Sequence, residues 1–285
     1  MPKYNNILSG VRKSCVKKIL CWMPFNVKAD PMTTSAKSLP IPPVTPAIKA
    51  ALAPYGKLRV GINMANFLLV SGKNDNGSAK GVSPDLAQYI AGLLDVPCVL
   101  VPFAGPGQLA DAIADDVWDL ANIAVEPERA ATIAFSNPYV LIDANFLTRK
   151  DSAIRTNADV DKKDISIILY GRSAYDLWLS DHYLNPTYLR VETIDLSHQR
   201  FKDGEGDVLA SLKPKLLSEL RGTGASDYRL ITEPFTAIKQ AVGMRPHHPD
   251  ALDFINRVIA HLLACGFIAD SLKTHQVEDK LSLPQ

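Results

Sequence analysis

Apolar and polar positions repeat with two different periods along the chain from Leu58 onward. Short apolar runs predict buried strands, and apolar residues three or four positions apart between these runs predict helices. In the first half the expected strands are 58–63, 97–103 and 118–125, and the expected helices are 83–95 and 105–116. Ser83 is expected to cap the first of these helices. This βαβαβ order predicts a parallel sheet with helices on its faces.

The second half of the chain repeats the pattern. The expected strands are 165–170, 188–193, 207–212 and 228–235, and the expected helices are 173–183, 195–204, 213–222, 249–266 and 267–276. Two α/β units in one chain indicate two lobes with a cleft between them. Ligands of open α/β sheets bind beyond the carboxyl ends of the strands, so the cleft is the expected site.

Charge is unevenly distributed, although the formal net charge is only +1. Residues 1–31 carry +5, so the rest of the chain carries −4. This balance does not favour a nucleic-acid partner. An apolar stretch after Lys18 and the small residues near Ala29 weakly resemble a signal peptide. The alternative is a poorly ordered extension with a Pro-rich linker over residues 1–56.

Cysteines and apolar runs add little to this picture. Cys15, Cys21, Cys98 and Cys265 form neither a CxxC pair nor a zinc-like spacing. We expect Cys98 and Cys265 to act as small apolar residues rather than as a disulfide. No run approaches the roughly 18 apolar residues of a membrane span, so none is expected. Neither a metal nor another cofactor is expected.

Four stretches of the first half resemble a known family. They read GKLRVGINMANF, GVSPDLAQYIAGLLDVPCVLVPF, WDLANIAVEPERAATIAFSNPYV and LTRKDS. In order and spacing they are similar to the family 3 solute-binding proteins, which are type II periplasmic binding proteins and mostly amino-acid receptors of ABC importers. The most specific segment matches the family pattern T-x-x-R-x-x-x-x-D-F-S-x-P-Y. The resemblance covers about residues 57–276.

The resemblance implies a two-lobe α/β fold in which each lobe is a mainly parallel sheet flanked by helices. The chain would cross between the lobes twice, at 143–152 and 235–245, and these strands would form the hinge. Lobe one would comprise 57–147 plus 240–285, and lobe two 148–239.

The same resemblance points to a carboxylate-binding arginine, Arg129. Its planar guanidinium can hold a carboxylate with two parallel hydrogen bonds; the alternative is a surface ion pair with Glu126 or Glu128. Asn122 and Ala124 match positions that line the family's site. Ala124 lacks the usual hydroxyl, and Asn122 would otherwise be a strand-end cap.

Further site positions follow from the resemblance in both lobes. Asn63 and Asn66 match polar and aromatic positions, and Phe67 is either a stacking surface for the ligand or a core residue. Arg172 and Ser173 lie at the start of a predicted helix, where free N–H groups favour an anion. Ser173 would cap that helix in either case.

One departure from the family concerns the ligand's ammonium group. Amino-acid receptors of this family place an aspartate after the fifth strand, whereas this chain reads Ser211-Leu212-Lys213 at the corresponding point. Without that aspartate a buried ammonium would lack its partner, which costs several kcal/mol. We therefore expect an anionic or neutral ligand, with Ser211 among the lining residues.

The hypothesis of an enzymatic function has less support in the sequence. The stretch GRSAY lacks the final glycine of a GxSxG motif, and His247-His248 has no further ligand at metal-binding spacing. A dehydratase-like enzyme on the same fold would need a general acid, for which Glu233, Asp176 and Glu126 are the candidates. The expected protein is therefore a non-enzymatic monomer with a small carboxylate ligand and an ABC permease as partner. The resemblance places it in the periplasm, and the alternative is a cytoplasmic sensor.

Overall fold

The computed structural model describes residues 40–221 and 225–285. The predictions for residues 1–39, including the signal-like stretch and Cys15 and Cys21, lie outside the described residues. The helices are α2 (Pro46–Leu52), α3 (Val82–Leu94), α4 (Pro106–Asp111), α5 (Pro127–Ala130), α6 (Ala174–His182), α7 (Ile194–Lys202), α8 (Lys213–Glu219), α9 (Pro249–Ala264) and α10 (Phe267–Thr274), with short 3₁₀ turns η1 (Asn157–Asp159) and η2 (Ala225–Asp227).

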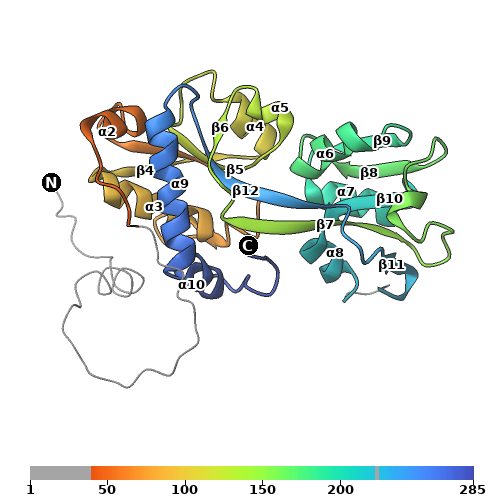
Figure 1. The fold of residues 1–285 in the computed structure, drawn as a ribbon. Helices are drawn as coiled ribbons and strands as arrows, with labels where there is room; N and C mark the ends of the chain where they lie inside the picture. Colours follow the sequence, from red (N-terminus) through yellow and green to blue (C-terminus); the bar gives the residue numbers. More distant parts are fainter. Residues whose placement is uncertain (1–39, 222–224) are drawn as a thin grey trace, which may run out of the picture.

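The strands are β1 (Leu58–Asn63), β2 (Gly72–Lys73), β3 (Ala79–Lys80), β4 (Cys98–Phe103), β5 (Leu120–Ala124), β6 (Ala134–Phe135), β7 (Val140–Arg149), β8 (Ser166–Tyr170), β9 (Thr187–Val191), β10 (Val208–Leu212), β11 (Tyr228–Leu230) and β12 (Thr236–Met244). Figure 1 shows the elements gathered into two lobes at the two ends of β7 and β12. The first lobe holds β1 to β6, α2 to α5, α9 and α10. The second lobe holds β8 to β11 and α6 to α8.

Strand pairing gives each lobe the same plan. In the first lobe β1 lies parallel to β4 and β5, and β12 is antiparallel to β5. In the second lobe β8 lies parallel to β9 and β10, and β7 is antiparallel to β10. β7 and β12 pair with each other from Ala144–Thr236 to Val140–Gln240 and so connect the lobes. The predicted two-lobe α/β fold with a two-strand hinge is confirmed. The lobe boundaries stay predictions, because both hinge strands pass from one lobe to the other without a break.

Packing in the first lobe follows from amphipathic helices on a buried sheet. α9 buries Phe254, Ile255, Val258, Ile259 and Leu262, whose spacing places them on one face. β5, at the centre of the lobe's sheet, is buried at all five positions, which places its carboxyl end inside the molecule. Residues that leave this strand therefore emerge at the inner side of the lobe.

Four local predictions differ from the structure. Residues 46–52, expected within a poorly ordered extension, form α2, which buries Ile48 and Leu52. α3 begins at Val82 with Gly81 as N-cap, so Ser83 is not the cap. Gly81 has φ of 149°, and a Cβ there would clash with the Leu69 carbonyl, so packing against residue 69 fixes the helix start.

The helix expected at 105–116 is α4, which ends at Asp111. Trp118 donates its indole N–H to the Leu109 carbonyl at 3.0 Å, and the residues after Asp111 form tight turns bonded three residues back. The strand expected at 228–235 is also shorter and comprises only β11.

A buried carboxylate joins three strands of the first lobe. Asp119, directly before β5, accepts hydrogen bonds from Arg59 Nε at 3.0 Å and from Arg59 NH2 at 2.7 Å. It also pairs with Arg245 NH2 at 2.8 Å, at the end of β12. The Asp119 side chain is fully buried. The cluster ties the returning hinge strand to the first lobe.

Among the described residues no single helix is long and apolar enough to cross a membrane. α9 and α10 reach the required length and composition only as a pair, and they are bent by 67° at the break between them.

Candidate functional site

The carboxyl end of β5 turns into α5 and carries Arg129 to the inner side of the first lobe. Glu126 is the N-cap of this four-residue helix and Pro127 occupies its first turn. The carbonyl of Arg129 accepts the N–H of Ile133 at 2.9 Å, which holds the turn that follows. Only 4% of Arg129 is exposed.

The Arg129 guanidinium contacts both lobes. NH1 donates to the carbonyl of Ala124 at 3.1 Å, and NH2 donates to the carbonyl of Arg172 in the second lobe at 3.1 Å. Burial lowers the pKa of Arg129 to about 10, while Glu126 and Glu128 oppose the shift, so the group remains charged at neutral pH. Two of its five N–H donors are given to these carbonyls.

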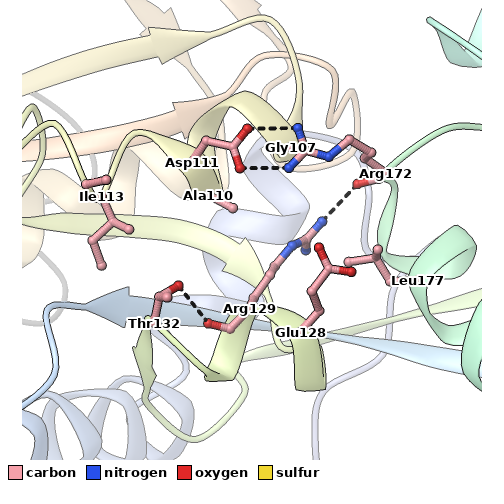
Figure 2. Close-up of a pocket in the computed structure, with 10 residues that line it drawn as sticks. Gly107, Ala110, Asp111, Ile113, Glu128, Arg129, Thr132, Arg172 and Leu177 are labelled. Carbon is pink, nitrogen blue, oxygen red and sulfur yellow. Dashed lines mark hydrogen bonds and ion pairs between the residues drawn. The ribbon is translucent and has the colours of Figure 1, made fainter.

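The start of α6 faces Arg129 from the second lobe. Ser173 caps the helix by accepting the N–H of Asp176 at 3.1 Å. Arg172, with φ of 59°, donates its backbone N–H to Asp176 Oδ2 at 2.7 Å. The Arg172 side chain reaches across to Asp111 of the first lobe, at 2.8 and 2.7 Å. Figure 2 shows both arginines pointing into the same space.

A cavity of about 190 Å³ lies between the two lobes at this point. It is lined by α4 and the turns after it, by Glu128, Arg129 and Thr132 around α5, and by Arg172 and Leu177 from the second lobe. Two guanidinium groups, two carboxylates and several apolar side chains therefore face one small volume. Such a mixture suits a small ligand that carries at least one anionic group.

Of the first-lobe residues predicted to bind ligand, Arg129 lines this cavity, whereas the two asparagines and the phenylalanine after β1 do not. Asn63 Oδ1 accepts the N–H of Ala65 at 3.1 Å, and Asn66 Oδ1 accepts the N–H of Leu69 at 3.3 Å, so both carboxamides stabilise the turn after β1. Phe67 is 38% exposed, which differs from the core alternative. Asn122 donates to the Ser83 carbonyl at 2.9 Å, a bond within the first lobe.

Ser211 faces the interior of the second lobe. It is fully buried, and its Oγ lies 2.9 Å from His198 Nε2, while His198 Nδ1 lies 3.2 Å from Glu219 Oε1. Burial lowers the pKa of His198 to about 4, although Glu219 opposes the shift, so the ring is neutral at pH 7. In this conformation the serine hydroxyl is bonded to the histidine and does not line the cavity.

The residues beside Ser211 offer no free carboxylate for an ammonium group. Leu212 is apolar and 7% exposed. Lys213 Nζ lies 2.9 Å from Asp143 Oδ2, so the nearest carboxylate on the hinge strand already has a cationic partner. The structure thus places an apolar side chain and an ion pair next to the expected aspartate position.

The three candidate general acids have different surroundings. Asp176 is 2% exposed and pairs with Arg190 at 2.9 Å, and Glu233 is exposed. Glu126 is 4% exposed. Burial raises the pKa of Glu126 to about 7; Asp181 of the second lobe adds to the shift, whereas Arg129 and Lys239 oppose it. Glu126 therefore exchanges its proton near neutral pH.

The structure also describes the surroundings of the histidine and cysteine residues considered from the sequence. No cluster of histidine, cysteine and acidic side chains that would hold a metal occurs in residues 40–221 and 225–285. His248 is the N-cap of α9 and His247 precedes it with φ of 72°. Burial raises the pKa of the free Cys98 thiol to about 12, so it stays protonated.

The family relationship follows from the whole body of the chain. The model of the bacterial extracellular solute-binding proteins, family 3, matches residues 58–276, well over half of the sequence. The chain belongs to this family. The predicted resemblance is therefore confirmed, and the family consists of binding proteins found outside the cytoplasm. No curated protein sequence gives a significant match.

Solved structures of similar fold include amino-acid-binding proteins. A mutant of ArgBP from T. maritima has a TM-score of 0.65 and 21% identity, covering 81% of this chain and 100% of that one. A putative ABC-transporter binding component from Wolinella succinogenes, complexed with lysine, has a TM-score of 0.64 and 19% identity, covering 77% of this chain and 95% of that one. The ancestral amino-acid-binding protein AncCDT-1, a precursor of cyclohexadienyl dehydratase, has a TM-score of 0.64 and 21% identity, covering 79% of this chain and 98% of that one. At these identities the likeness shows the fold.

Several residues at the site of this solute-binding protein were not predicted. Asp111, Gly107 and Leu177 line the cavity, as do Glu128 and Thr132. The run Gly105-Pro106-Gly107 was a usable signal, because small residues at a helix start allow another segment to approach closely. Asp111 carried no such signal, since its partner Arg172 lies 61 residues further along the chain.

The raised pKa of Glu126 predicts a pH-dependent stability. The folded protein binds this proton more tightly than the unfolded chain, whose ordinary value is 4.5. The contribution of Glu126 to the free energy of unfolding should therefore be greatest below pH 4.5 and decrease as the pH rises through about 7. Urea unfolding of wild type and Glu126→Gln at pH 5 and pH 8 measures this, because the variant should lose less stability over that interval. Equal losses in the two proteins would refute the assignment.

Proposed function

We propose that this solute-binding protein captures a small carboxylate-bearing ligand, an amino acid or an organic acid, between its two lobes. The observation that carries the proposal is the buried Arg129 guanidinium, which lines the interlobe cavity and contacts a carbonyl of each lobe. A ligand carboxylate would take donors that the two carbonyls leave available. The turn at Ser173 would approach the same group from the second lobe.

This arrangement favours closure of the two lobes around the ligand. Ligand contacts from both lobes favour the closed form over the open one, because each lobe alone supplies only part of the site. The partner of the closed form would be an ABC permease, the compartment would be the periplasm, and the protein would act as a monomer. Further ligand-binding residues stay predictions, namely Asn63, Asn66, Phe67, Asn122, Ala124, Arg172 and Ser211.

We further propose that the ligand is not held through an α-ammonium group. The similar structure from Wolinella succinogenes is complexed with lysine, which carries such a group. Here Leu212 is apolar, and Asp143 is already paired with Lys213. An ammonium placed next to Ser211 would lack a carboxylate partner there and would lose several kcal/mol. The carboxylates that line the cavity are on the other side, where Asp111 pairs with Arg172 and Glu128 lies beside Arg129.

Isothermal titration with a panel of organic acids and common amino acids tests the ligand class. At least one organic acid should bind, and its amide, which lacks the negative charge, should bind much more weakly. The amino acids should show no binding in the micromolar range. Micromolar affinity for a common amino acid would contradict the proposal about the ammonium group, whereas no acid binding at all would contradict the carboxylate site.

A dehydratase-like activity is the second candidate, and Glu126 is the observation that favours it. Its pKa of about 7 suits proton transfer near neutral pH, and it precedes Arg129 by three residues at the start of α5, close enough for the two charges to interact. Proton NMR of an acid that binds in the titration panel decides between the two. Unchanged ligand supports binding alone, and conversion that Glu126→Gln abolishes supports an enzyme.

A further inference from the structure

We propose that Asp111 and Arg172 form an ion-pair clasp between the lobes, which positions Arg129 and slows the release of ligand. The proposal rests on the proposed function of Arg129 as the carboxylate-binding residue. Neither partner of the clasp needs to touch the ligand for it to act. Asp111 is a positioning residue in this account.

The geometry of the clasp is specific. Arg172 NH1 lies 2.8 Å from Asp111 Oδ2, and Arg172 NH2 lies 2.7 Å from Asp111 Oδ1, so both carboxylate oxygens accept from one guanidinium. Asp111 ends α4 in the first lobe, and Arg172 precedes α6 in the second. A two-pronged pair of this kind requires the two planar groups to be aligned, which fixes the relative position of α4 and the α6 start.

The backbone on both sides accommodates this contact. Arg172 adopts φ of 59°, a left-handed conformation that is unfavourable for a residue other than glycine, and its N–H is held by Asp176 Oδ2 at 2.7 Å. On the other side, a Cβ added to Gly107 would lie 3.0 Å from Arg172 Cζ. Glycine at 107 therefore lets the guanidinium lie directly against α4.

Arg172 also connects the clasp to Arg129. Its side chain pairs with Asp111, while its backbone carbonyl accepts Arg129 NH2 at 3.1 Å. Figure 2 shows Asp111 beside the Arg172 guanidinium, and Arg129 pointing toward the Arg172 backbone. Opening the clasp frees Arg172 to move away with the second lobe, and Arg129 then loses one of the two carbonyls that orient it.

The solvent exposure of the ion pair limits how much it can slow ligand dissociation. The side chains of Arg172 and Asp111 are 53% and 62% exposed, so water and salt screen their attraction. The neighbouring Glu128 adds negative charge beside Arg172. An exposed pair contributes modestly, so loss of the clasp should raise the ligand dissociation rate by about fivefold at low salt and less at high salt.

Charge reversal tests the clasp. Asp111→Arg and Arg172→Asp each place like charges across the lobes, and the double variant restores an opposite pair. We expect each single variant to dissociate a bound acid from the panel about fivefold faster or more, and the double variant to dissociate it more slowly than either single variant. Asp253→Arg, which reverses one member of an exposed pair within α9, is the matched control and should leave the rate unchanged.

Small-angle X-ray scattering without ligand separates this proposal from the proposed function. The single variants should have a larger radius of gyration than wild type, and the double variant should not. Singles that match wild type in both measurements, or a double variant no better than the singles, would overturn the clasp. Failure of every acid to bind would overturn the carboxylate site, while the scattering comparison would still decide the clasp.

Discussion

Replacing Arg129 with alanine is expected to weaken the binding of a carboxylate ligand by about 100-fold or more in Kd. The guanidinium is 4% exposed and bridges the lobes through Ala124 and Arg172, so its removal deletes both the ligand's charged partner and a contact that accompanies closure. Removing one member of a buried charged pair costs at least about 3 kcal/mol, which corresponds to that factor. Isothermal titration with an acid from the panel measures the change.

Arg129→Lys is the informative control for this prediction. Lysine keeps the positive charge but lacks the planar fork, so we expect an affinity between those of wild type and Arg129→Ala. Thermal melting of each variant checks that the fold is retained. An alanine variant that melts like wild type and binds the acid equally well would rule out Arg129 as the carboxylate-binding residue.

Replacing Asp119 with alanine is expected to produce the largest loss of stability, about 3 kcal/mol in the free energy of unfolding. The carboxylate is fully buried and pairs with both Arg59 and Arg245, and its removal leaves these guanidinium groups with Asp116, which is 43% exposed, as their remaining shared carboxylate. The expected loss lies at the lower end for a buried pair, since these arginine side chains are 14% and 28% exposed and retain some contact with water. Urea unfolding monitored by circular dichroism gives the value.

Asp253→Ala supplies the comparison for Asp119. Asp253 pairs with Arg257 on the surface of α9, where both side chains are about half exposed, so no measurable change is expected. If Asp119→Ala were as stable as Asp253→Ala, the buried cluster would not hold the returning hinge strand to the first lobe.

The fold could be predicted from the sequence because its strands and helices carry strong hydrophobic periods. β5 is buried along its whole length and α9 has a single buried face, and both elements were predicted close to their actual bounds. Element ends were harder, because contacts with distant residues determine them. The Leu69 carbonyl sets the start of α3, and the Trp118 indole takes a carbonyl near the end of α4.

The candidate site could be predicted only where a motif marks it. Arg129 belongs to a distinctive segment, and the structure places it at the cavity between the lobes. Ser211 was expected to line the ligand, whereas its hydroxyl lies 2.9 Å from Nε2 of His198 in α7, a contact that no local pattern marks. Asp111 was not predicted at all, since an ion pair between two lobes has no local pattern in the sequence.

The most direct test of the central claim is a native mass spectrum of purified wild type and Arg129→Ala, followed by identification of any released small molecule. We expect wild type to retain a compound that carries a carboxylic acid, and Arg129→Ala to have lost it. A retained compound without an acid group, or an acid that both proteins hold to the same extent, would contradict the account.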